Sequence, residues 1–255
     1  MNSTLNKAVL LAAGKGTRMK GLTADLPKPM IPVAGVPILE RILMGLRDAA
    51  IRQFLVITGY QADAVHAHFG DGSAWDVSIC YSHQTVQDGT GRVIELAKDF
   101  VKGEAFLLSY GDILVPKTVY QGIQDQWAKN IADGLLTVQL GEDIRKGAVA
   151  IFDGSFYLRE LIEKPTAAEI QKLRAQFGDF KPWYNAGIYV FTPRIFDYAA
   201  GLQKSARGEY ELTDAIRQMI SDGIKFCGLK ITGDWMDVRD PEALAKAHRQ
   251  FGKAS

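Results

Sequence analysis

Glycines and cations near the N-terminus form the first pattern that could carry chemistry. The sequence LAAGKGTRM places Gly14 and Gly16 directly after an apolar segment, residues 7–12, that is typical of a buried strand. Glycine backbone allows several N–H groups to close on an anion. Arg18 and Lys28 could add positive charge, the arginine through its planar fork and the lysine as a point charge. These residues predict a phosphate-binding loop at the end of the first strand.

Two well-known phosphate loops do not match this sequence. A dinucleotide-binding fingerprint needs a third glycine where Met19 stands, and a P-loop needs Gly-Lys-Ser/Thr where Gly21, Leu22 and Thr23 stand. A plain strand followed by turn glycines is the alternative interpretation. It is less favoured because an arginine and the segment LPKPMIPV follow the glycines directly.

A carboxylate also stands at the end of a strand-like segment. Asp112 follows Gly111 after the apolar run AFLLSY, and ligands of open α/β folds bind at the carboxyl edge of the parallel strands. On these residues alone, a cap or turn role for this aspartate stays open. No serine, cysteine or histidine has a persuasive triad context, which favours chemistry by positioning and charge neutralisation.

The elements that must position these residues alternate along the first part of the chain. Strand-like segments are separated by stretches of helical length, which predicts a mostly parallel sheet with helices on its faces. The predicted strands are residues 7–12, 53–59, 76–82, 105–110 and 135–140; the predicted helices are residues 36–50, 91–100, 212–221 and a last one opened by Pro241, while residues 166–181 are predicted to form a helix and a surface loop. In the second half, the segments GAVAIFD, FYLRELIEKP and NAGIYVFTP lie closer together, which predicts a small antiparallel addition.

The composition is that of an ordinary globular protein. The 255 residues suit one large domain, and 30 Lys and Arg against 29 Asp and Glu leave no charge surplus that would favour nucleic acid or an anionic membrane as partner. No apolar run reaches the roughly 18–20 residues of a membrane span, and glycines interrupt the one near the N-terminus, so we expect a cytoplasmic protein. Cys80 and Cys227 lie in apolar alternating segments and are predicted to be core thiols.

Five motifs together resemble the sugar-1-phosphate nucleotidyltransferases, the family that makes nucleotide sugars from nucleoside triphosphates. In chain order they are LAAGKGTRM with LPKPMIPVAGVPILE, GTG at 89–91 with Gln84 upstream, YGD at 110–112, EKP at 163–165 with NAGIY at 185–189, and WMD at 235–237. The resemblance implies a single α/β domain of three layers, with a mostly parallel Rossmann-like central sheet, helices on both faces and a small antiparallel sugar-binding addition. It also implies a nucleotide-binding half over about residues 1–140 and a sugar-binding half over about residues 141–255.

The same resemblance implies a reaction and a role for each motif. The phosphate of a sugar 1-phosphate would attack the α-phosphorus of the triphosphate in line, and pyrophosphate would leave. Arg18 and Lys28 would be the catalytic cations, and Asp112 and Asp237 would bind Mg²⁺ with phosphate oxygens and water, although Asp237 could instead pair with Arg239. The implied nucleotide-binding residues are Leu11, Ala12, Ala13, Gly14, Gly16, Thr17, Gln84, Gly89, Thr90, Tyr110 and Gly111; the implied sugar-phosphate-binding residues are Gly147, Glu163, Lys164 and Asn185.

The nucleotide and the class of function leave alternatives at this stage. UTP is favoured because the Gln84 amide can read a pyrimidine edge, but dTTP and CTP fit the same motifs. A metal-dependent glycosyltransferase is disfavoured because Ile113 and Leu114 follow Asp112 where a DxD motif needs a second carboxylate. A non-catalytic nucleotide-sugar-binding regulatory subunit is disfavoured because the charged residues of the motifs are all present, namely Arg18, Lys28, Asp112, Lys164 and Asp237. A homo-oligomer is compatible with the resemblance, and we expect no appended hexapeptide-repeat acetyltransferase domain because the sequence ends soon after Asp237.

Overall fold

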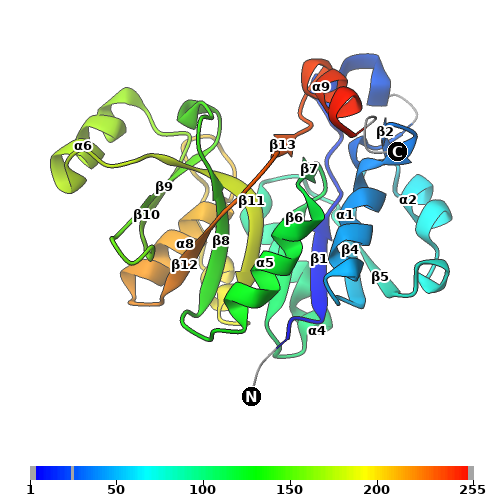
Figure 1. Ribbon diagram of the computed structural model, residues 1–255, viewed down its shortest axis with the longest axis horizontal. Helices are drawn as coiled ribbons and strands as arrows, with labels where there is room; N and C mark the ends of the chain where they lie inside the picture. The colour runs from blue at the N-terminus through cyan, green and yellow to red at the C-terminus, as the bar shows by residue number, and fades with distance from the viewer. Residues whose placement is uncertain (1–3, 24–25, 252–255) are drawn as a thin grey trace.

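Strands and helices alternate along the chain in the computed structural model, which describes residues 4–23 and 26–251 (Figure 1). The strands are β1 (Lys7–Leu11), β2 (Pro32–Val33), β3 (Val36–Pro37), β4 (Gln53–Thr58), β5 (Ser78–His83), β6 (Phe106–Tyr110), β7 (Ile113–Leu114), β8 (Gly134–Gln139), β9 (Ala148–Phe152), β10 (Leu158–Glu163), β11 (Trp183–Phe191), β12 (Phe226–Lys230) and β13 (Met236–Asp237). The α-helices are α1 (Ile38–Asp48), α2 (Ala62–Phe69), α3 (Thr90–Val93), α4 (Lys98–Val101), α5 (Lys117–Trp127), α6 (Ala167–Phe177), α7 (Ile195–Ala200), α8 (Leu212–Ser221) and α9 (Pro241–Phe251). Short 3₁₀ helices cover Thr17–Thr23, Lys28–Met30, Ser73–Trp75, Ile94–Ala97 and Ile144–Lys146.

A mixed central sheet in the order β10-β9-β11-β6-β1-β4-β5 connects the two halves of the molecule. Strand β1 pairs in parallel with β4 and β6, and β4 pairs in parallel with β5. Strand β11 is antiparallel to β6, β8 and β9, so it joins the parallel half to the antiparallel addition that the sequence predicts. Because Leu11 lies opposite Tyr110 at the ends of β1 and β6, the two loops that follow these strands begin side by side.

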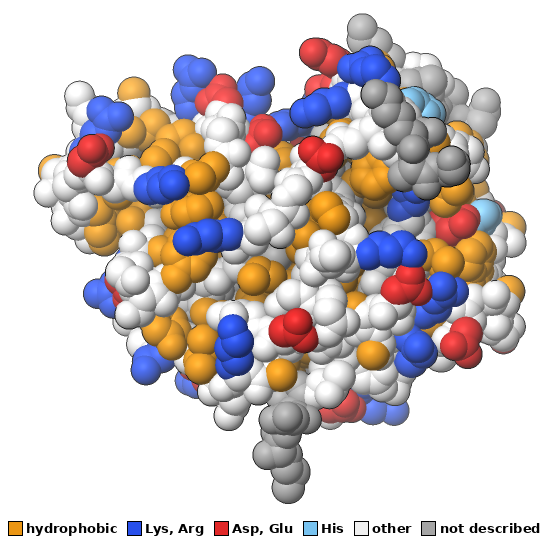
Figure 2. All heavy atoms as spheres, viewed as in Figure 1, with side chains coloured by type: hydrophobic (Ala, Val, Ile, Leu, Met, Phe, Trp, Pro, Cys, Tyr) orange, Lys and Arg blue, Asp and Glu red, His pale blue; other side chains and the backbone are white. Residues whose placement is uncertain are grey.

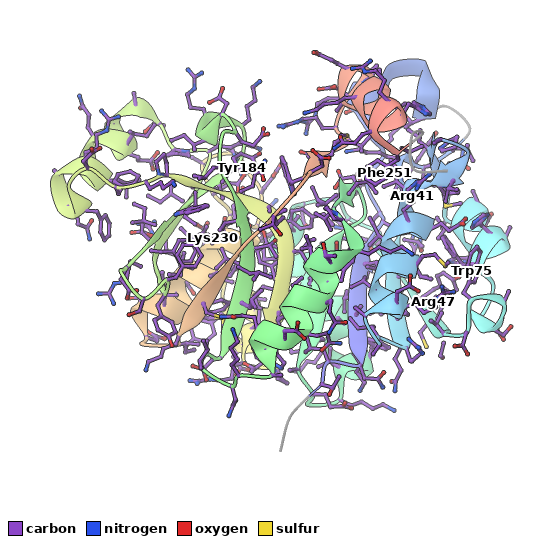
Figure 3. All side chains as sticks on the ribbon, in the orientation of Figure 1. Arg41, Arg47, Trp75, Tyr184, Lys230 and Phe251 are labelled. Atoms are coloured by element: carbon purple, nitrogen blue, oxygen red, sulfur yellow. The ribbon has the colours of Figure 1, made fainter. Side chains whose placement is uncertain are left out.

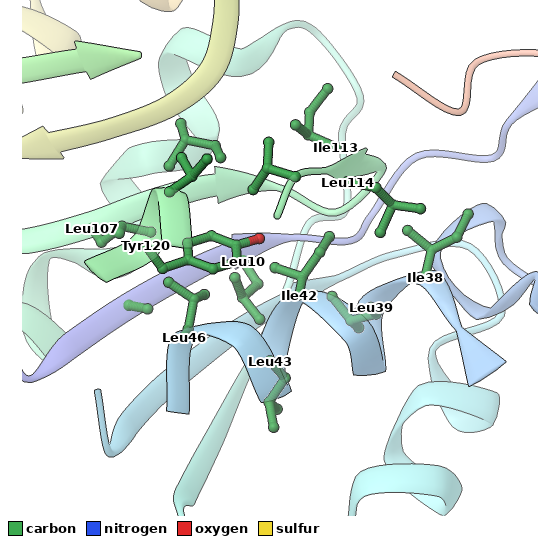
Figure 4. Close-up of a cluster of buried hydrophobic side chains, with 14 of the residues drawn as sticks. Leu10, Ile38, Leu39, Ile42, Leu43, Leu46, Leu107, Ile113, Leu114 and Tyr120 are labelled. Atoms are coloured by element: carbon green, nitrogen blue, oxygen red, sulfur yellow. The ribbon is translucent and has the colours of Figure 1, made fainter. Parts of the chain in front are cut away.

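Helix α1 shows how the apolar periodicity fixes a helix on the sheet. Ile38, Leu39, Ile42, Leu43 and Leu46 are fully buried at three- and four-residue spacing, and they pack with Leu10 and Leu107 of the sheet (Figure 4). Burial of each such side chain contributes about 1.5–3 kcal/mol. Pro37 precedes the first turn of the helix, and the strands β2 and β3 connect it to the 3₁₀ turn Lys28–Met30.

The predicted helices differ from the structure mainly in one segment. Residues 91–100 form no single helix, because α3, a 3₁₀ turn at Ile94–Ala97 and α4 follow one another there. Helix α8 has the predicted bounds, and α6 begins after Thr166, whose side chain forms a reciprocal capping box with Glu169. No helix of the described residues is long and apolar enough to span a membrane.

The prediction that both cysteines are core thiols is wrong for one of them. Cys227 is buried in β12, but Cys80 is exposed. Strand β5 is at the end of the sheet order, and the side chains of successive strand residues point to opposite faces. Ile79 therefore faces the core while Cys80 faces away from it.

Candidate active site

A cavity of about 580 Å³ lies at the carboxyl ends of β1 and β6. Its walls come from both halves of the chain, since they include the glycine loop after β1, the loop 84–90, and residues of β9, β10 and β11. Figure 2 shows the molecule notched between its two halves, with Lys and Arg side chains on both rims of the notch. This is the position at which open α/β sheets bind their ligands.

The glycine loop turns tightly against the segment that carries Lys28. Gly16 has a φ of +66°, and a Cβ at this position would lie 2.8 Å from the Cβ of Lys28. The carbonyl of Gly16 accepts a hydrogen bond from the Met19 N–H at 2.8 Å, and the buried Met19 side chain anchors the turn. Arg18, one residue earlier, is exposed and lines the cavity. The loop therefore needs glycine for its conformation and for the close approach of Lys28.

Lys28 lies between two aspartates. Its Nζ forms an ion pair with Asp112 Oδ2 and lies 4.0 Å from Asp237 Oδ1. The side chain is only 12% exposed, and the buried Pro29 and Met30 follow it in the same 3₁₀ turn. The ammonium group is thus held at one place on the cavity wall.

Backbone contacts hold Asp112 at the end of β6. The Gly111 N–H donates to the Leu11 carbonyl at 2.9 Å, and a Cβ at Gly111 would lie 2.6 Å from that same oxygen. A side chain at position 111 would push the two strand ends apart. Glycine is therefore required next to the aspartate.

Asp237, in the C-terminal part of the chain, also lies next to Lys28. Strand β13 pairs antiparallel with β7, which places Asp237 opposite Ile113. Burial, followed by the nearby Asp112 charge, raises the pKa of Asp237 to about 6, although Lys28 and Arg239 act in the opposite direction. Its Oδ1 atom is buried and has no hydrogen-bond partner among the described residues. Asp237 also pairs with Arg239 at 3.5 Å, so the ion pair considered from the sequence is present beside Lys28.

The loop after β5 brings two glutamines to the cavity. The backbone N–H of Gln84 donates to Thr58 at 2.7 Å, and its side-chain amide donates to the Val86 carbonyl at 2.9 Å. The Gln87 amide, which sequence reasoning did not select, donates to the Ala13 carbonyl at 2.8 Å. Gln87 therefore links this loop to the glycine loop across the cavity.

Gly89 and Thr90 continue this wall. A Cβ at Gly89, whose φ is +119°, would lie 2.3 Å from the Tyr210 carbonyl oxygen. Thr90 Oγ1 accepts a weak hydrogen bond from the Leu212 N–H at 3.4 Å. The GTG motif thus fits against the start of α8, and its glycines are required for that close contact.

The opposite wall carries a charged cluster around Glu163. Lys164 Nζ lies 3.8 Å from Glu163 Oε1, and Arg207 Nη1 lies 3.7 Å from the same oxygen. Arg207 also forms an ion pair with the buried Glu211. Burial raises the pKa of Glu163, and the two neighbouring cations oppose that effect.

Gly147 and Asn185 lie on the same wall of the cavity, each next to a tyrosine. A Cβ at Gly147 would lie 2.2 Å from the Tyr184 hydroxyl, so the ring of Tyr184 closes against the backbone there. The Asn185 amide donates to the Tyr189 hydroxyl at 2.6 Å, and that hydroxyl lies 3.3 Å from the Tyr110 hydroxyl. Burial raises the pKa of Tyr189 to about 12, so this phenol is neutral and can take part in the hydrogen-bond chain.

The structure brings nearly all the predicted site residues to one cavity. The exception is Ala12, which is 1% exposed and packs in the core behind the glycine loop. Sequence reasoning missed polar residues that also line the cavity, namely Lys15, Gln87, Lys146, Arg207, Glu209 and Glu211. Most of these lie in loops without periodic pattern, so the sequence alone gives no signal for them.

The described residues contain no group of three or more His, Cys, Asp or Glu that could hold a metal ion. Asp112 and Asp237 are a pair of hard oxygen donors, and one of their oxygens is buried without a hydrogen-bond partner. Mg²⁺ accepts such an incomplete protein shell, since it is usually bound by one or two carboxylates with substrate phosphates and waters. The donor set therefore fits Mg²⁺.

A family profile and several known proteins match nearly the whole chain. The profile of the nucleotidyl transferase family matches residues 7–254. Bifunctional protein GlmU of Methanococcus aeolicus is 35% identical over 246 residues, which cover 96% of this chain and 54% of that protein. UTP–glucose-1-phosphate uridylyltransferase AglF of Haloferax volcanii is 30% identical over 246 residues, which cover 96% of each chain. The chain thus spans about half the length of GlmU but nearly all of AglF.

Two solved structures share the fold over almost the whole chain. A protein described as a glucose-1-phosphate thymidylyltransferase from Bacillus anthracis superposes with a TM-score of 0.83 at 24% identity, covering 96% of this chain and 95% of that one. A UDP-glucose pyrophosphorylase superposes with a TM-score of 0.84 at 18% identity, covering 98% and 100%. These two likenesses support the α/β fold class predicted from the sequence. On the family profile and the AglF match, the chain belongs to the nucleotidyl transferase family, among the sugar-1-phosphate nucleotidyltransferases.

Proposed function

We propose that this protein transfers a nucleotidyl group from UTP to a sugar 1-phosphate, giving a nucleotide sugar and pyrophosphate. The observation that carries the proposal is the convergence of Lys28, Asp112 and Asp237 in one cavity whose two walls come from different halves of the chain. One wall offers a glycine loop and a side-chain amide; the other offers a carboxylate flanked by cations. Two anionic substrates could therefore meet at the Lys28 ammonium group.

In the proposed reaction, a phosphate oxygen of the sugar 1-phosphate attacks the α-phosphorus of UTP. A new phosphorus–oxygen bond forms, and the bond from the α-phosphorus to the bridging oxygen breaks, so pyrophosphate leaves with that oxygen. Such a transfer needs positioning and charge neutralisation more than covalent chemistry from the protein. Lys28 is fixed where it can hold both reacting phosphates, and Arg18 is exposed at the cavity wall where it can neutralise the leaving group.

Asp112 and Asp237 would hold Mg²⁺, which would supply further neutralisation of phosphate charge. Lys28 is the positive neighbour that the two carboxylates share. Burial and the nearby Asp112 charge raise the pKa of Asp237, so a negative charge on this carboxyl is disfavoured there. A divalent cation at this pair of carboxylates would offset that charge.

The Glu163 wall would bind the sugar phosphate. Glu163 could accept hydrogen bonds from sugar hydroxyls, and Lys164, with the neighbouring Arg207, would attract the phosphate. Gly147 would let the sugar approach the backbone. Asn185 would contact the sugar directly. It would also act through Tyr189, because its amide already donates to the Tyr189 hydroxyl.

This assignment divides the chain into a nucleotide-binding half over about residues 1–140 and a sugar-binding half over about residues 141–255. AglF, whose match covers 96% of each chain, is named as a UTP-dependent enzyme, and this supports UTP as the nucleotide.

Soluble substrates of this kind also suit a cytoplasmic enzyme.

Pyrophosphate release by the purified protein tests the proposal. The assay combines Mg²⁺ with each of UTP, dTTP, CTP, GTP and ATP against the 1-phosphates of glucose, N-acetylglucosamine, mannose and N-acetylmuramic acid. We expect pyrophosphate release with UTP, and we expect EDTA to abolish it. Release with another triphosphate alone would replace UTP in the proposal. No release in any combination, together with calorimetric binding of a nucleotide sugar, would identify a non-catalytic subunit instead.

A further inference from the structure

A second cavity, of about 570 Å³, adjoins the first. The two share five lining residues, Arg18, Lys146, Trp235, Asp237 and Arg239. The remaining wall of the second cavity comes mainly from one face of α9. A molecule bound at Lys28 and Asp237 could therefore extend directly into it.

Helix α9 is held so that this face stays directed at the cavity. Its opposite face buries Leu244 and Ala247. The Asp240 carboxylate accepts a hydrogen bond from the Ala243 N–H at 2.9 Å and thereby caps the first turn. At the other end, the Phe251 ring packs on the Arg41 guanidinium of α1 at 5.3 Å, two residues that are labelled side by side in Figure 3.

Two cations on the cavity face of α9 have no partner in the part of the chain that the structure describes. Lys246 and Arg249 are three residues apart, so they are neighbours on the helix surface. Neither has an ion pair or a hydrogen bond within residues 4–23 and 26–251, and both line the second cavity. Ala243, a small residue, lies on the same wall and leaves space in front of them.

Three of the four acidic groups of this cavity already have a partner within its wall. Asp237 and Glu142 lie 3.5 and 3.6 Å from Arg239, and the Asp240 carboxylate caps α9. Glu242 is the acidic group left on the helix face. The lining of the second cavity holds five cations, Arg18, Lys146, Arg239, Lys246 and Arg249, against four carboxylates, Glu142, Asp237, Asp240 and Glu242, so its net charge is +1. Because Arg239 already pairs with two of the carboxylates, Lys246 and Arg249 are the cations that can bind a compact anion.

We propose that the second cavity is a pyrophosphate subsite in which Lys246 and Arg249 bind the β- and γ-phosphoryl groups. The inference rests on the proposed function, because that reaction produces pyrophosphate beside Arg18 and Asp237. The same diphosphate chemistry could come from two sources: the tail of bound UTP, or free pyrophosphate after the phosphorus–oxygen bond has broken. Either source places the leaving group against α9.

Calorimetric titration with inorganic pyrophosphate, UTP and UMP in the presence of Mg²⁺ tests the subsite. The test variant is Lys246→Ala/Arg249→Ala, and the matched control is Lys172→Ala/Arg174→Ala, which removes two exposed cations from α6 away from both cavities. The pyrophosphate affinity of the test variant is expected to fall about tenfold or more, and its UMP affinity should not change. Each single variant should show part of the effect, and all the changed side chains are exposed, so thermal unfolding should stay at the wild-type value.

The UTP titration separates the two sources. A parallel loss of UTP affinity means that the tail of the bound triphosphate already occupies the subsite; an unchanged UTP affinity with weakened pyrophosphate binding means that it is filled only after cleavage. Pyrophosphate affinity equal to that of the control variant would overturn the inference. These titrations need no turnover, so they decide the subsite even if the substrate grid shows no release, and full activity with unchanged pyrophosphate binding would reject the subsite alone.

Discussion

The backbone N–H of Val238 donates a hydrogen bond to the carbonyl oxygen of Asp112 at 3.0 Å. This bond extends the short pairing of β7 with β13, in which Asp237 lies opposite Ile113. The two carboxylates are therefore brought together by main-chain contacts, which do not depend on either side chain. Changing one carboxylate should leave the position of the other intact.

Asp112→Asn should lower kcat at least about 100-fold while changing the affinity for UTP much less. The amide has the shape of the carboxylate but lacks the charge that would hold Mg²⁺ and that pairs with Lys28. A loss of about 100-fold corresponds to about 2.7 kcal/mol of transition-state stabilisation. Steady-state kinetics and UTP calorimetry on the same preparation check both parts. Turnover at the wild-type rate would show that Asp112 is not a metal ligand.

Asp237→Asn should stabilise the protein in metal-free buffer above about pH 6. Burial raises the pKa of Asp237 to about 6, from 3.8 in the unfolded chain, so the folded state holds this proton more tightly. The stability that results is complete below the unfolded pKa and is lost as the pH rises through about 6. Asparagine removes this dependence, and the gain at pH 7.5 should be between about 1 and 3 kcal/mol.

Urea unfolding at pH 4.5 and pH 7.5, with EDTA present, measures this gain. The exposed Asp234, three residues earlier, gives the matched control Asp234→Asn, which should change little at either pH. If Asp237→Asn were less stable than wild type at pH 7.5, the Lys28 and Arg239 contacts would outweigh the burial of the charge. The variant should lose activity in either case.

Gly147→Ala should raise the KM for the sugar 1-phosphate more than the KM for UTP. The new Cβ would lie 2.2 Å from the Tyr184 hydroxyl, so the tyrosine must move into the cavity or the β9 backbone must shift. Gly154→Ala is a suitable control, because nothing lies within 4 Å of its added Cβ. Equal increases in both KM values would mean that Gly147 affects the whole cavity and does not belong to the sugar side.

The sequence predicted those parts of the molecule that repeat or that form contiguous motifs. The apolar runs gave β1, β4 and β6, and the three- and four-residue spacing gave α1 and α8, because burial of one face controls these elements. Cys80 was misplaced because an apolar alternating segment does not reveal that its strand lies at a sheet edge. The split of residues 91–100 into short helices likewise leaves no mark in a weak apolar pattern.

The charged contacts of the site depend on distances that no local pattern contains. Lys28 and Asp112 are 84 positions apart, and their ion pair exists because β1 and β6 are neighbours in the sheet. Gln87 and Arg207 are single polar residues in loops, and only the folded chain shows that they face the cavity. Motif resemblance located the residues on which the family signature depends, but it could not give these cross-loop partners.

Glu163→Gln should change which sugar 1-phosphates the enzyme accepts. Burial raises the pKa of Glu163, and Lys164 and Arg207, whose nitrogens lie 3.8 and 3.7 Å from its carboxyl group, oppose that effect. Glutamine keeps a carbonyl acceptor but replaces the second acceptor with a donor and removes the charge that holds both cations. The ratio of kcat/KM between two sugars that differ in one hydroxyl should therefore change by about tenfold. A buried polar group left without its hydrogen-bond partner costs about the free energy that corresponds to this factor.

Glu160→Gln is the matched control for this variant. Glu160 lies on the same strand, β10, but its carboxylate pairs with Arg217 at 2.8 Å and does not line the cavity. The ratio of kcat/KM between glucose and mannose 1-phosphates, measured for both variants, isolates the effect of the cavity carboxylate. A ratio for Glu163→Gln that matches both Glu160→Gln and wild type would remove Glu163 from the sugar pocket, and would leave Lys164 and Arg207 as ligands of phosphate alone.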